Sequence, residues 1–312
     1  MSVNFARGAG VFQKLLIVLL ISTGVGLATT ARGEDERFSL ILEQDGPGKA
    51  VLMANNDQPF PVTARIDFNN CRSLAHGSSP SVTVVVDASY RGRLLDLKLI
   101  DTGKRYGYSM DYSPGDYRVY REQQDVAPAY LFPFQHGRKY KVGQGFFGRF
   151  SHSEPGHQHA VDFQLEEGDP VHAVADGSFI RAQDHFRRGG LDPELNSKAN
   201  VVEIYHPARG TISQYSHLAY GSVRVDVGQR VAGGQRIADS GATGYLSGPH
   251  LHFSISAPRA NGDVATVPYR FRDTDGSAVE PVDGHYYYAN HREQADFEVL
   301  YGLSLIHISE PT

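Results

Sequence analysis

The stretch Gly248-Pro249-His250-Leu251-His252-Phe253-Ser254-Ile255 decides the fold prediction, because apolar and polar residues alternate in it as they do along a β-strand. Side chains alternate faces along a strand, so His250 and His252 point the same way, roughly 7 Å apart, while Leu251 and Phe253 turn to the core. That geometry allows one histidine to bind a metal while the other reaches a metal-bound water. With fourteen histidines in 312 residues, chance supplies such a pair about as often as not, so the interpretation depends on further ligands elsewhere.

The length and composition are those of a soluble globular protein with room for two domains, since 40% of the residues are hydrophobic and 21% are charged. The net charge is −5 and the isoelectric point is near 6.3. Because there is no basic surplus, we expect no nucleic-acid partner.

The N-terminus has the order of a secretory signal peptide. Basic residues precede the apolar run 15–28, and the small-residue stretch 29–33 follows it. An uncleaved membrane anchor is the alternative, but the run is short for a bilayer and contains two glycines. We therefore expect residues 1–33 to be removed after Ala31 or Gly33, with no stable membrane insertion afterwards. The mature protein would be periplasmic or extracellular.

Two further features bear on compartment and completeness. Outside the cytoplasm the lone Cys71 cannot form an internal disulfide, and its isolation argues against a thiol-based site. Residues 303–312 (LSLIHISEPT) resemble a translated sequencing adapter, so His307 is excluded from every candidate site.

The first half predicts an all-β module, a small β-sandwich over residues 34–120, because short β-branched or alternating runs are separated by turn-rich clusters. The polar stretch 121–129 is typical of a linker. The module carries no cluster of reactive side chains, which favours a positioning role. The expected strands are 38–42, 51–54, 62–68, 81–86 and 94–100.

The second half, residues 130–302, predicts a glycine-rich antiparallel β domain without a convincing amphipathic helix. Apolar residues alternate with glycine turns over 227–238, as in a hairpin-built barrel. The expected strands are 171–177, 201–205, 212–217, 223–225 and 250–255.

Two places could complete a metal site with His252. Asp162 lies between apolar neighbours, where a buried carboxylate would need a cation or donors, although an edge strand with Asp162 facing water fits the local pattern equally well. His217 follows a predicted strand, and alone it would be interpreted as a surface histidine.

Together these motifs resemble the lysostaphin/LytM-type zinc metalloendopeptidases, which cleave bacterial peptidoglycan. The similarity runs from about Tyr130 to Ile255, and chance agreement of separated motifs in one order is remote. The motifs in chain order are Gln144-Gly145-x-x-Gly148-x-x-Ser151-His152, Ala160-Val161-Asp162-Phe163 with the stretch 168–177, Tyr215-x-His217-Leu218, the glycine segment 227–238, and Gly241-x-Thr243-Gly244 leading into Gly248-Pro249-His250-Leu251-His252.

The resemblance implies a role for each matching residue. His152, Asp162 and His252 would hold one Zn²⁺ per chain, and His217 and His250 would be the catalytic histidines lining the water. Three nitrogen and oxygen ligands without cysteine suit a catalytic zinc with an open position rather than a closed structural site. The expected architecture is therefore an N-terminal β-sandwich followed by a β domain with a zinc cleft.

The first ligand leaves an alternative open. The commonest family form has this ligand four residues before the aspartate, where this chain has Gln158. A less common form, with Ser-His before a loop, fits His152. His157 is the second choice and His159 the third, because the loop geometry cannot be derived from the sequence.

The implied function is that of an exported zinc metalloendopeptidase hydrolysing peptide bonds in peptidoglycan cross-links or stem peptides through a zinc-activated water, with peptidoglycan peptides as partners. The N-terminal module would position substrate or mask the site. A catalytically silent relative that activates other wall hydrolases is the alternative. A carbohydrate-binding β-protein is a second, whereas a lipoyl or biotinyl carrier is excluded because 227–238 contains no lysine.

Overall fold

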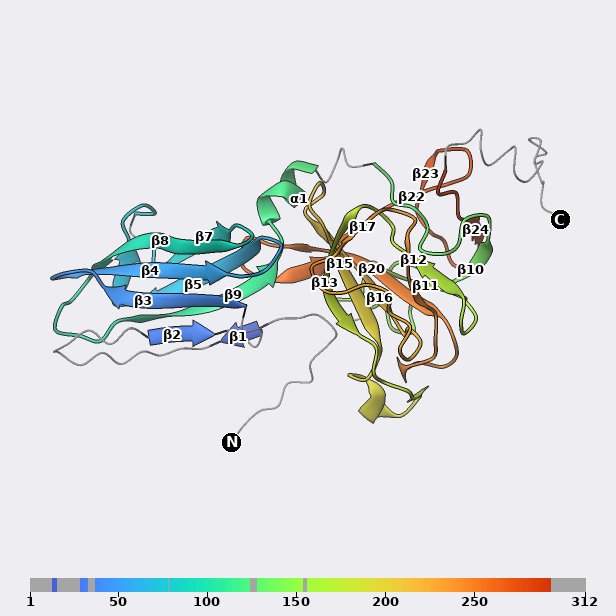
Figure 1. The fold of residues 1–312 in the computed structure, drawn as a ribbon, viewed down its shortest axis with the longest axis horizontal. Helices are drawn as coiled ribbons and strands as arrows, with labels where there is room; N and C mark the ends of the chain where they lie inside the picture. The colour runs from blue at the N-terminus through green and yellow to red at the C-terminus, as the bar shows by residue number, and fades with distance from the viewer. Residues whose placement is uncertain are drawn as a thin grey trace. The chain divides into compact units, whose positions relative to one another are not determined.

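The computed structural model describes residues 37–77, 79–123, 128–153 and 156–292, together with the backbone of 13–15 and 29–32. Most of the predicted signal peptide and all of 303–312 lie outside these residues. The regular secondary structure of the described residues is almost entirely β-strand (Figure 1), which confirms the all-β prediction. Two compact units are present: unit 1 comprises Met1–Val126, Tyr205–Ile212 and Ser256–Ala265, and unit 2 comprises Ala127–Ile204, Ser213–Ile255 and Thr266–Thr312.

Unit 1 contains two sheets that share one apolar core, as predicted for a small sandwich. Leu40 and Leu52 from one sheet and Ile66 from the other are fully buried there, because alternate residues of each strand face inward. One sheet has the order β1-β9-β5-β7 and the other β2-β3-β4-β8-β6. The bounds are β1 Gln13–Leu15, β2 Thr29–Arg32, β3 Phe38–Gln44, β4 Lys49–Asn56, β5 Val62–Asn69, β6 Cys71–Ser73, β7 Ser81–Val86, β8 Tyr90–Leu99 and β9 Gly107–Pro114.

Three elements of unit 1 differ from the prediction. The helix α1, Tyr117–Gln123, runs into the stretch interpreted as a linker, because Asp116 accepts the Arg118 backbone N–H and begins a helical turn. Strands β1 and β2 lie inside the predicted signal peptide and pair with β9 and β3. Cys71 is buried, and burial raises the pKa of its thiol to about 11, so it is an unreactive core residue.

The main sheet of the second half of the chain has nine strands among the described residues and is open, so the predicted barrel is wrong. Its order is β17-β13-β15-β16-β20-β11-β10-β24, with β21 beside β20. Strands β17 and β24 are the two edges of the sheet, and they do not pair with each other. The bounds are β10 Lys139–Gln144, β11 Ala160–Phe163, β13 Gly177–Gln183, β15 Val201–His206, β16 Thr211–Ser216, β17 Arg230–Val231, β20 Leu251–Pro258, β21 Val264–Thr266 and β24 Tyr286–Tyr288.

The remaining elements among the described residues of this half are short two-stranded ladders and one 3-10 helix. The ladders pair β12 Pro170–His172 with β18 Arg236–Asp239, β14 Gly189–Gly190 with β19 Gly244–Tyr245, and β22 Phe271–Arg272 with β23 Ala278–Val279; the helix is η1 Pro193–Leu195.

Of the strands predicted in this half, one is shorter than expected and one is absent. The run 171–177 breaks after β12, because the backbone of Ala173 bonds to Gln235 and Gly234 and Val174 accepts from Leu131. The run 223–225 is a loop, in which the Arg224 N–H donates to Ile237 without a ladder.

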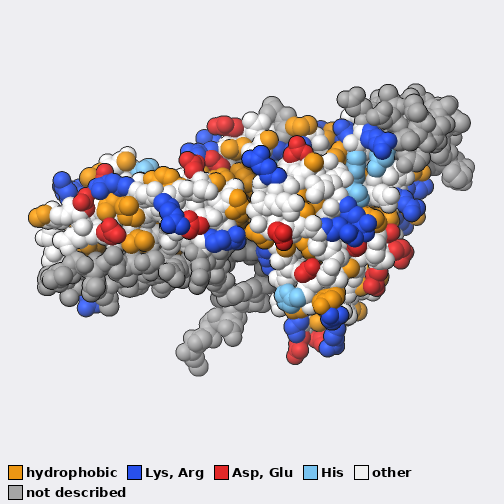
Figure 2. All heavy atoms as spheres, in the orientation of Figure 1, with side chains coloured by type: hydrophobic (Ala, Val, Ile, Leu, Met, Phe, Trp, Pro, Cys, Tyr) orange, Lys and Arg blue, Asp and Glu red, His pale blue; other side chains and the backbone are white. Residues whose placement is uncertain are grey.

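Two surface properties concern partners. On the face drawn in Figure 2, acidic and basic side chains are interspersed, so that face has no broad basic patch for nucleic acid. Among the described residues, no helix has the length and apolar character needed to cross a membrane.

Candidate metal centre

Strands β11 and β20 place the first two candidate ligands side by side. The strands are antiparallel with Asp162 opposite His252, so both side chains project from the same face. Their neighbours Val161, Phe163 and Phe253 are fully buried on the other face. The local alternation thus directs apolar residues into the core and the two polar groups toward each other, and Nδ1 of His252 lies 2.9 Å from Oδ1 of Asp162.

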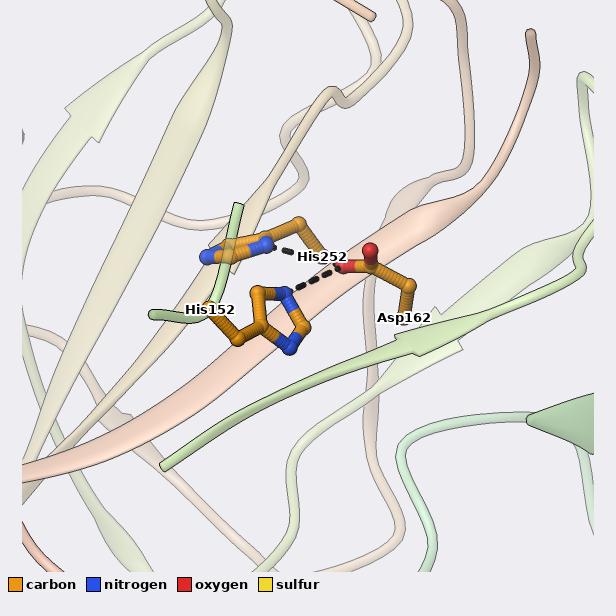
Figure 3. Close-up of side chains that lie close together, drawn as sticks. All are labelled: His152, Asp162 and His252. Carbon is orange, nitrogen blue, oxygen red and sulfur yellow. Dashed lines mark hydrogen bonds and ion pairs between the residues drawn. The ribbon is translucent and has the colours of Figure 1, made fainter. Parts of the chain in front are cut away.

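His152 reaches the same carboxylate from the loop after β10. Its side chain is fully buried, and Nε2 lies 3.3 Å from Oδ1 of Asp162 (Figure 3). Ligand atoms of His152, Asp162 and His252 all lie within 4.8 Å of one another, and no other such group occurs among the described histidines, cysteines and acids. The structure therefore brings together the three residues predicted as ligands.

The tautomer of His152 leaves a lone pair directed at a negative charge. Nδ1 lies 2.8 Å from the Gly145 carbonyl, which can only accept, so Nδ1 carries the hydrogen. Nε2 is buried and makes no hydrogen bond, although the carboxylate is adjacent. A lone pair facing a carboxylate is unfavourable unless a proton or a cation lies between them.

The electrostatics of the group favour positive charge at this point. Burial opposes the charged form of Asp162, yet His152 and His252 hold the pKa of its carboxyl well below the usual range. Burial likewise lowers the pKa of His152, but Asp162 and the Gly145 carbonyl outweigh it, and the net shift is upward. The carboxylate is thus ionised, and the site attracts cations.

Gln144, quoted in the sequence motif without a role, joins the two ligands. Its Nε2 donates to Oδ2 of Asp162 at 3.2 Å and to Oγ of Ser151 at 2.9 Å. Its Oε1 accepts from the backbone of Phe150 at 2.8 Å and from that of Ser151 at 3.3 Å. One buried side chain therefore orients Asp162 and anchors the chain entering His152.

The glycine at 148 is explained by this contact. A β-carbon there would overlap the Gln144 side chain, so only glycine leaves room for the amide. A signal for Gln144 existed in the sequence, as a polar residue beside motif glycines, but its hydrogen bonds span a loop that the pattern does not describe.

The two predicted catalytic histidines lie beside the group. The ring centroids of His217 and His250 are 4.7 Å apart, and Nε2 of His250 is 3.7 Å from Oδ1 of Asp162. Each Nδ1 lies close to a backbone carbonyl, at 2.7 Å from Thr243 for His217 and 2.9 Å from Gly248 for His250. Because the carbonyls only accept, Nδ1 of each ring carries a hydrogen, so Nε2 is the nitrogen left to face the site.

His217 has two further marks of a specialised residue. Its φ of 64° is in the left-handed region, which is uncommon for a side chain other than glycine and recurs at functional sites. Burial, followed by the neighbouring His250 and His252, lowers the pKa of its imidazole to about 3. The ring is therefore neutral at physiological pH, and its Nε2 can accept a hydrogen bond.

The alternative first ligands lie differently. The His157 ring is 5.6 Å from that of His252, and His157 is outside the group that faces Asp162. His159 Nδ1 lies 3.2 Å from the Thr266 carbonyl, away from the carboxylate. Of the three histidines in the loop, the geometry favours His152.

Comparison with known proteins assigns a family to the segment that holds most of this group. The family model for peptidase family M23 matches residues 156–266. This segment is an M23 peptidase domain. The match includes Asp162, His217, His250 and His252 and begins after His152, and it agrees with the resemblance derived from the motifs.

Individual relatives of the M23 domain are similar over part of their length. The glycyl-glycine endopeptidase ALE-1 of Staphylococcus capitis is 32% identical over 137 residues, covering 44% of this chain and 35% of that protein. The peptidoglycan DD-endopeptidase ShyA of Vibrio cholerae is 35% identical over 95 residues, covering 30% of this chain and 19% of its own. The chain spans about a third of the length of the first curated relatives that it matches.

Among solved structures, lysostaphin from Staphylococcus simulans is 28% identical, covering 41% of this chain and 47% of its own, with a TM-score of 0.30.

The donor atoms of His152, Asp162 and His252 fit a zinc ion. Two imidazoles and a carboxylate are a usual catalytic zinc set, and ligand atoms at tetrahedral angles around zinc stand roughly 3.4 Å apart. The 3.3 Å and 2.9 Å separations from Oδ1 of Asp162 to Nε2 of His152 and Nδ1 of His252 are close to that value. The unbonded Nε2 of His152 is the atom that such an ion would satisfy.

Proposed function

We propose that the protein is an exported zinc metalloendopeptidase that hydrolyses peptide bonds in peptidoglycan cross-links or stem peptides. The observation that carries the proposal is the convergence of His152, Asp162 and His252 on one point, with His217 and His250 beside it. The named activities of ALE-1 and ShyA, a glycyl-glycine endopeptidase and a peptidoglycan DD-endopeptidase, support this substrate class.

His152, Asp162 and His252 would hold the ion, and zinc when bound supplies a Lewis acid that polarises the scissile carbonyl and lowers the pKa of water. Gln144 holds the Asp162 carboxylate in position through Oδ2, leaving Oδ1 toward the two ligand histidines. The buried setting strengthens each of these interactions.

His217 and His250 would move the protons of the reaction. His217 has its Nδ1–H anchored on Thr243 and a pKa of about 3, so the ring stays neutral and its Nε2 can accept a hydrogen bond from the reacting groups. His250 lies between His217 and Asp162, with Nδ1 anchored on Gly248. A proton taken by one ring can be donated to the leaving amine, and a protonated ring can stabilise the oxyanion.

Metal content tests the ligand set. We expect about one zinc per chain in the purified protein, measured by elemental analysis, near-complete loss in His152→Ala and retention in His157→Ala. Loss of zinc in His157→Ala with retention in His152→Ala would assign the first ligand to the other histidine. A folded, metal-free protein would contradict the zinc site altogether.

Digestion of purified peptidoglycan tests the reaction. New amine and carboxyl ends should appear with the wild-type protein and be absent with His250→Ala. A zinc-loaded, folded protein that releases neither end from any peptidoglycan would instead be a silent relative that activates other hydrolases.

Export rests on the charged, apolar and small-residue order of residues 1–33. Fractionation of cells that produce the full chain should place the protein outside the cytoplasm.

A further inference from the structure

The edge strand of the nine-stranded sheet carries two exposed tyrosines that the proposed reaction does not use. Tyr286 and Tyr288 lie two residues apart on β24, the last strand in the sheet order, and are 58% and 37% exposed. Tyr287 between them points the other way, with its ring 5.4 Å from that of the buried Phe132. Because side chains alternate along a strand, the two exposed rings share the outer face.

A lysine joins the two rings into one surface. The Lys139 ammonium lies 5.0 Å from the Tyr286 ring centroid and 5.3 Å from that of Tyr288. Lys139 pairs directly with Tyr288 on the neighbouring strand, and Lys141 pairs with Tyr286. These four residues are called the tyrosine platform below. Aromatic faces with cations beside them suit a sugar chain that carries carboxylates.

The platform lies on the same face of the sheet as the metal centre. Val142 pairs with the buried Phe163, and after a register shift Gln144 pairs with Asp162. Directly paired residues face the same side, so Val142 points to the core and Lys139 and Lys141 to the side opposite to it. That opposite side is the one from which Asp162 and Gln144 project.

The spacing suits a polymer with peptide branches. From Lys139 to Gln144, β10 covers about 17 Å at the rise of an extended strand. An extended peptide gains about 3.4 Å per residue, so roughly five residues of a branch reach from the platform to the metal centre. A glycan strand held on the tyrosines could therefore present a bond in its peptide branch to the ligands.

We propose that the tyrosine platform binds the glycan strands of peptidoglycan. The proposal rests on the two exposed rings, on Lys139 beside both of them, and on the sheet face that they share with the metal centre. This inference rests on the proposed function, since it names a second part of the same substrate. Stacking of the rings on sugars supplies the contact, and Lys139 and Lys141 pair with the free carboxylates of the peptide branches.

The test measures binding separately from hydrolysis. Peptide-free glycan strands prepared from purified peptidoglycan are titrated against the full chain and against Tyr286→Ala/Tyr288→Ala. We expect the double alanine variant to bind roughly tenfold more weakly, and Tyr286→Phe/Tyr288→Phe to bind as the wild type does because it keeps both rings. Both tyrosines are exposed, so neither pair of changes removes core contacts.

Three outcomes overturn the platform. They are unchanged glycan binding in the double alanine variant, equal binding of polyglutamate, which would show charge attraction alone, and preferential binding of free pentaglycine, which would show a peptide added to the β24 edge.

Turnover separates this inference from the proposed function. The double alanine variant should cleave a short soluble peptide at the wild-type rate and intact peptidoglycan several-fold more slowly. No cleavage of either substrate by the wild type contradicts the peptidase, whereas equal cleavage of intact peptidoglycan by the wild type and the variant contradicts only the platform.

Discussion

Gln144 shows how a residue that would not touch the metal can set the geometry of a site. Its four hydrogen bonds join Asp162 to the backbone at Phe150 and Ser151. We expect Gln144→Ala to weaken zinc binding by about 10- to 100-fold, the usual effect of removing a group that orients a ligand. Competition with a chromophoric chelator measures the affinity.

Gln144→Glu makes that prediction specific. The glutamate keeps the acceptor for Phe150 but loses the donor to Asp162, so its zinc affinity should also fall. The matched control is the exposed Gln164→Ala on the adjoining stretch, which should bind zinc as the wild type does. Equal affinity in all four proteins would leave Gln144 with a packing role only.

His217 and His250 should separate turnover from metal binding. Each has its Nδ1 anchored on a backbone carbonyl, and neither belongs to the group of three ligand atoms. His217→Ala and His250→Ala are therefore expected to retain about one zinc while kcat falls by roughly 10²- to 10⁴-fold, as for loss of a proton-transfer group. Loss of zinc in His250→Ala would exchange the roles of His250 and His252.

The sequence could identify these residue types but not their joint geometry. The strand alternation around His252 and Asp162 is local, and both lie on the face that the pattern indicates. His152 is placed by a loop. Whether His152 or His157 is the first ligand depends on which ring reaches the Asp162 carboxylate, and the loop conformation decides this. Likewise the left-handed backbone at His217 follows from tertiary contacts, not from local propensity.

At the scale of elements, a second histidine cluster joins the end of the described chain to the core. His291 Nε2 lies 2.9 Å from the Phe132 carbonyl, and its ring is near His172 and His136. Burial first, and then these histidines and Arg272, lower the pKa of His291 to about 4. In the unfolded chain the pKa of this histidine is near 6.5. As the pH is lowered, the unfolded state is therefore protonated before the folded state.

The free energy of unfolding should therefore fall as the pH decreases from about 6.5 to 4. The loss attributable to His291 is up to about 3 kcal/mol, and none of it has occurred above pH 6.5. Urea unfolding at pH 7 and pH 5 measures it. His291→Gln, which can still donate to Phe132, should lose less stability on acidification, whereas the exposed His185→Gln should behave as the wild type. An unchanged pH slope in His291→Gln would contradict the assignment.

The elements that could be predicted are those with a clear local sequence pattern. The runs at β3, β5, β7, β15 and β16 were predicted because β-branched or alternating residues mark them. By contrast, α1 was missed because its first residues were assigned to the sandwich and its last to the linker, and the helix contains no buried residue. The glycine hairpins at 227–238 indicated a barrel, but closure of a sheet depends on its two edges, which local patterns do not describe.

At the scale of the whole molecule, the proposed export would remove N-terminal residues that form two strands of the fold. Removal of residues 1–33 would remove β1 and β2, which pair with β9 and β3. The apolar core of unit 1 nevertheless extends from Phe38 to Tyr112, and β3 and β9 each keep a longer partner, β4 and β5. Because burial of apolar surface dominates stability, the module should tolerate the loss of both strands.

We expect the intact mass of exported protein to correspond to a chain that begins after Ala31 or Gly33. A chain produced without residues 1–33 should unfold within a few degrees of the uncleaved chain, because none of the described core residues is removed. Thermal unfolding of both forms measures this. A large loss of stability on truncation would mean that β1 and β2 belong to the mature fold, and the apolar run 15–28 would then need another role.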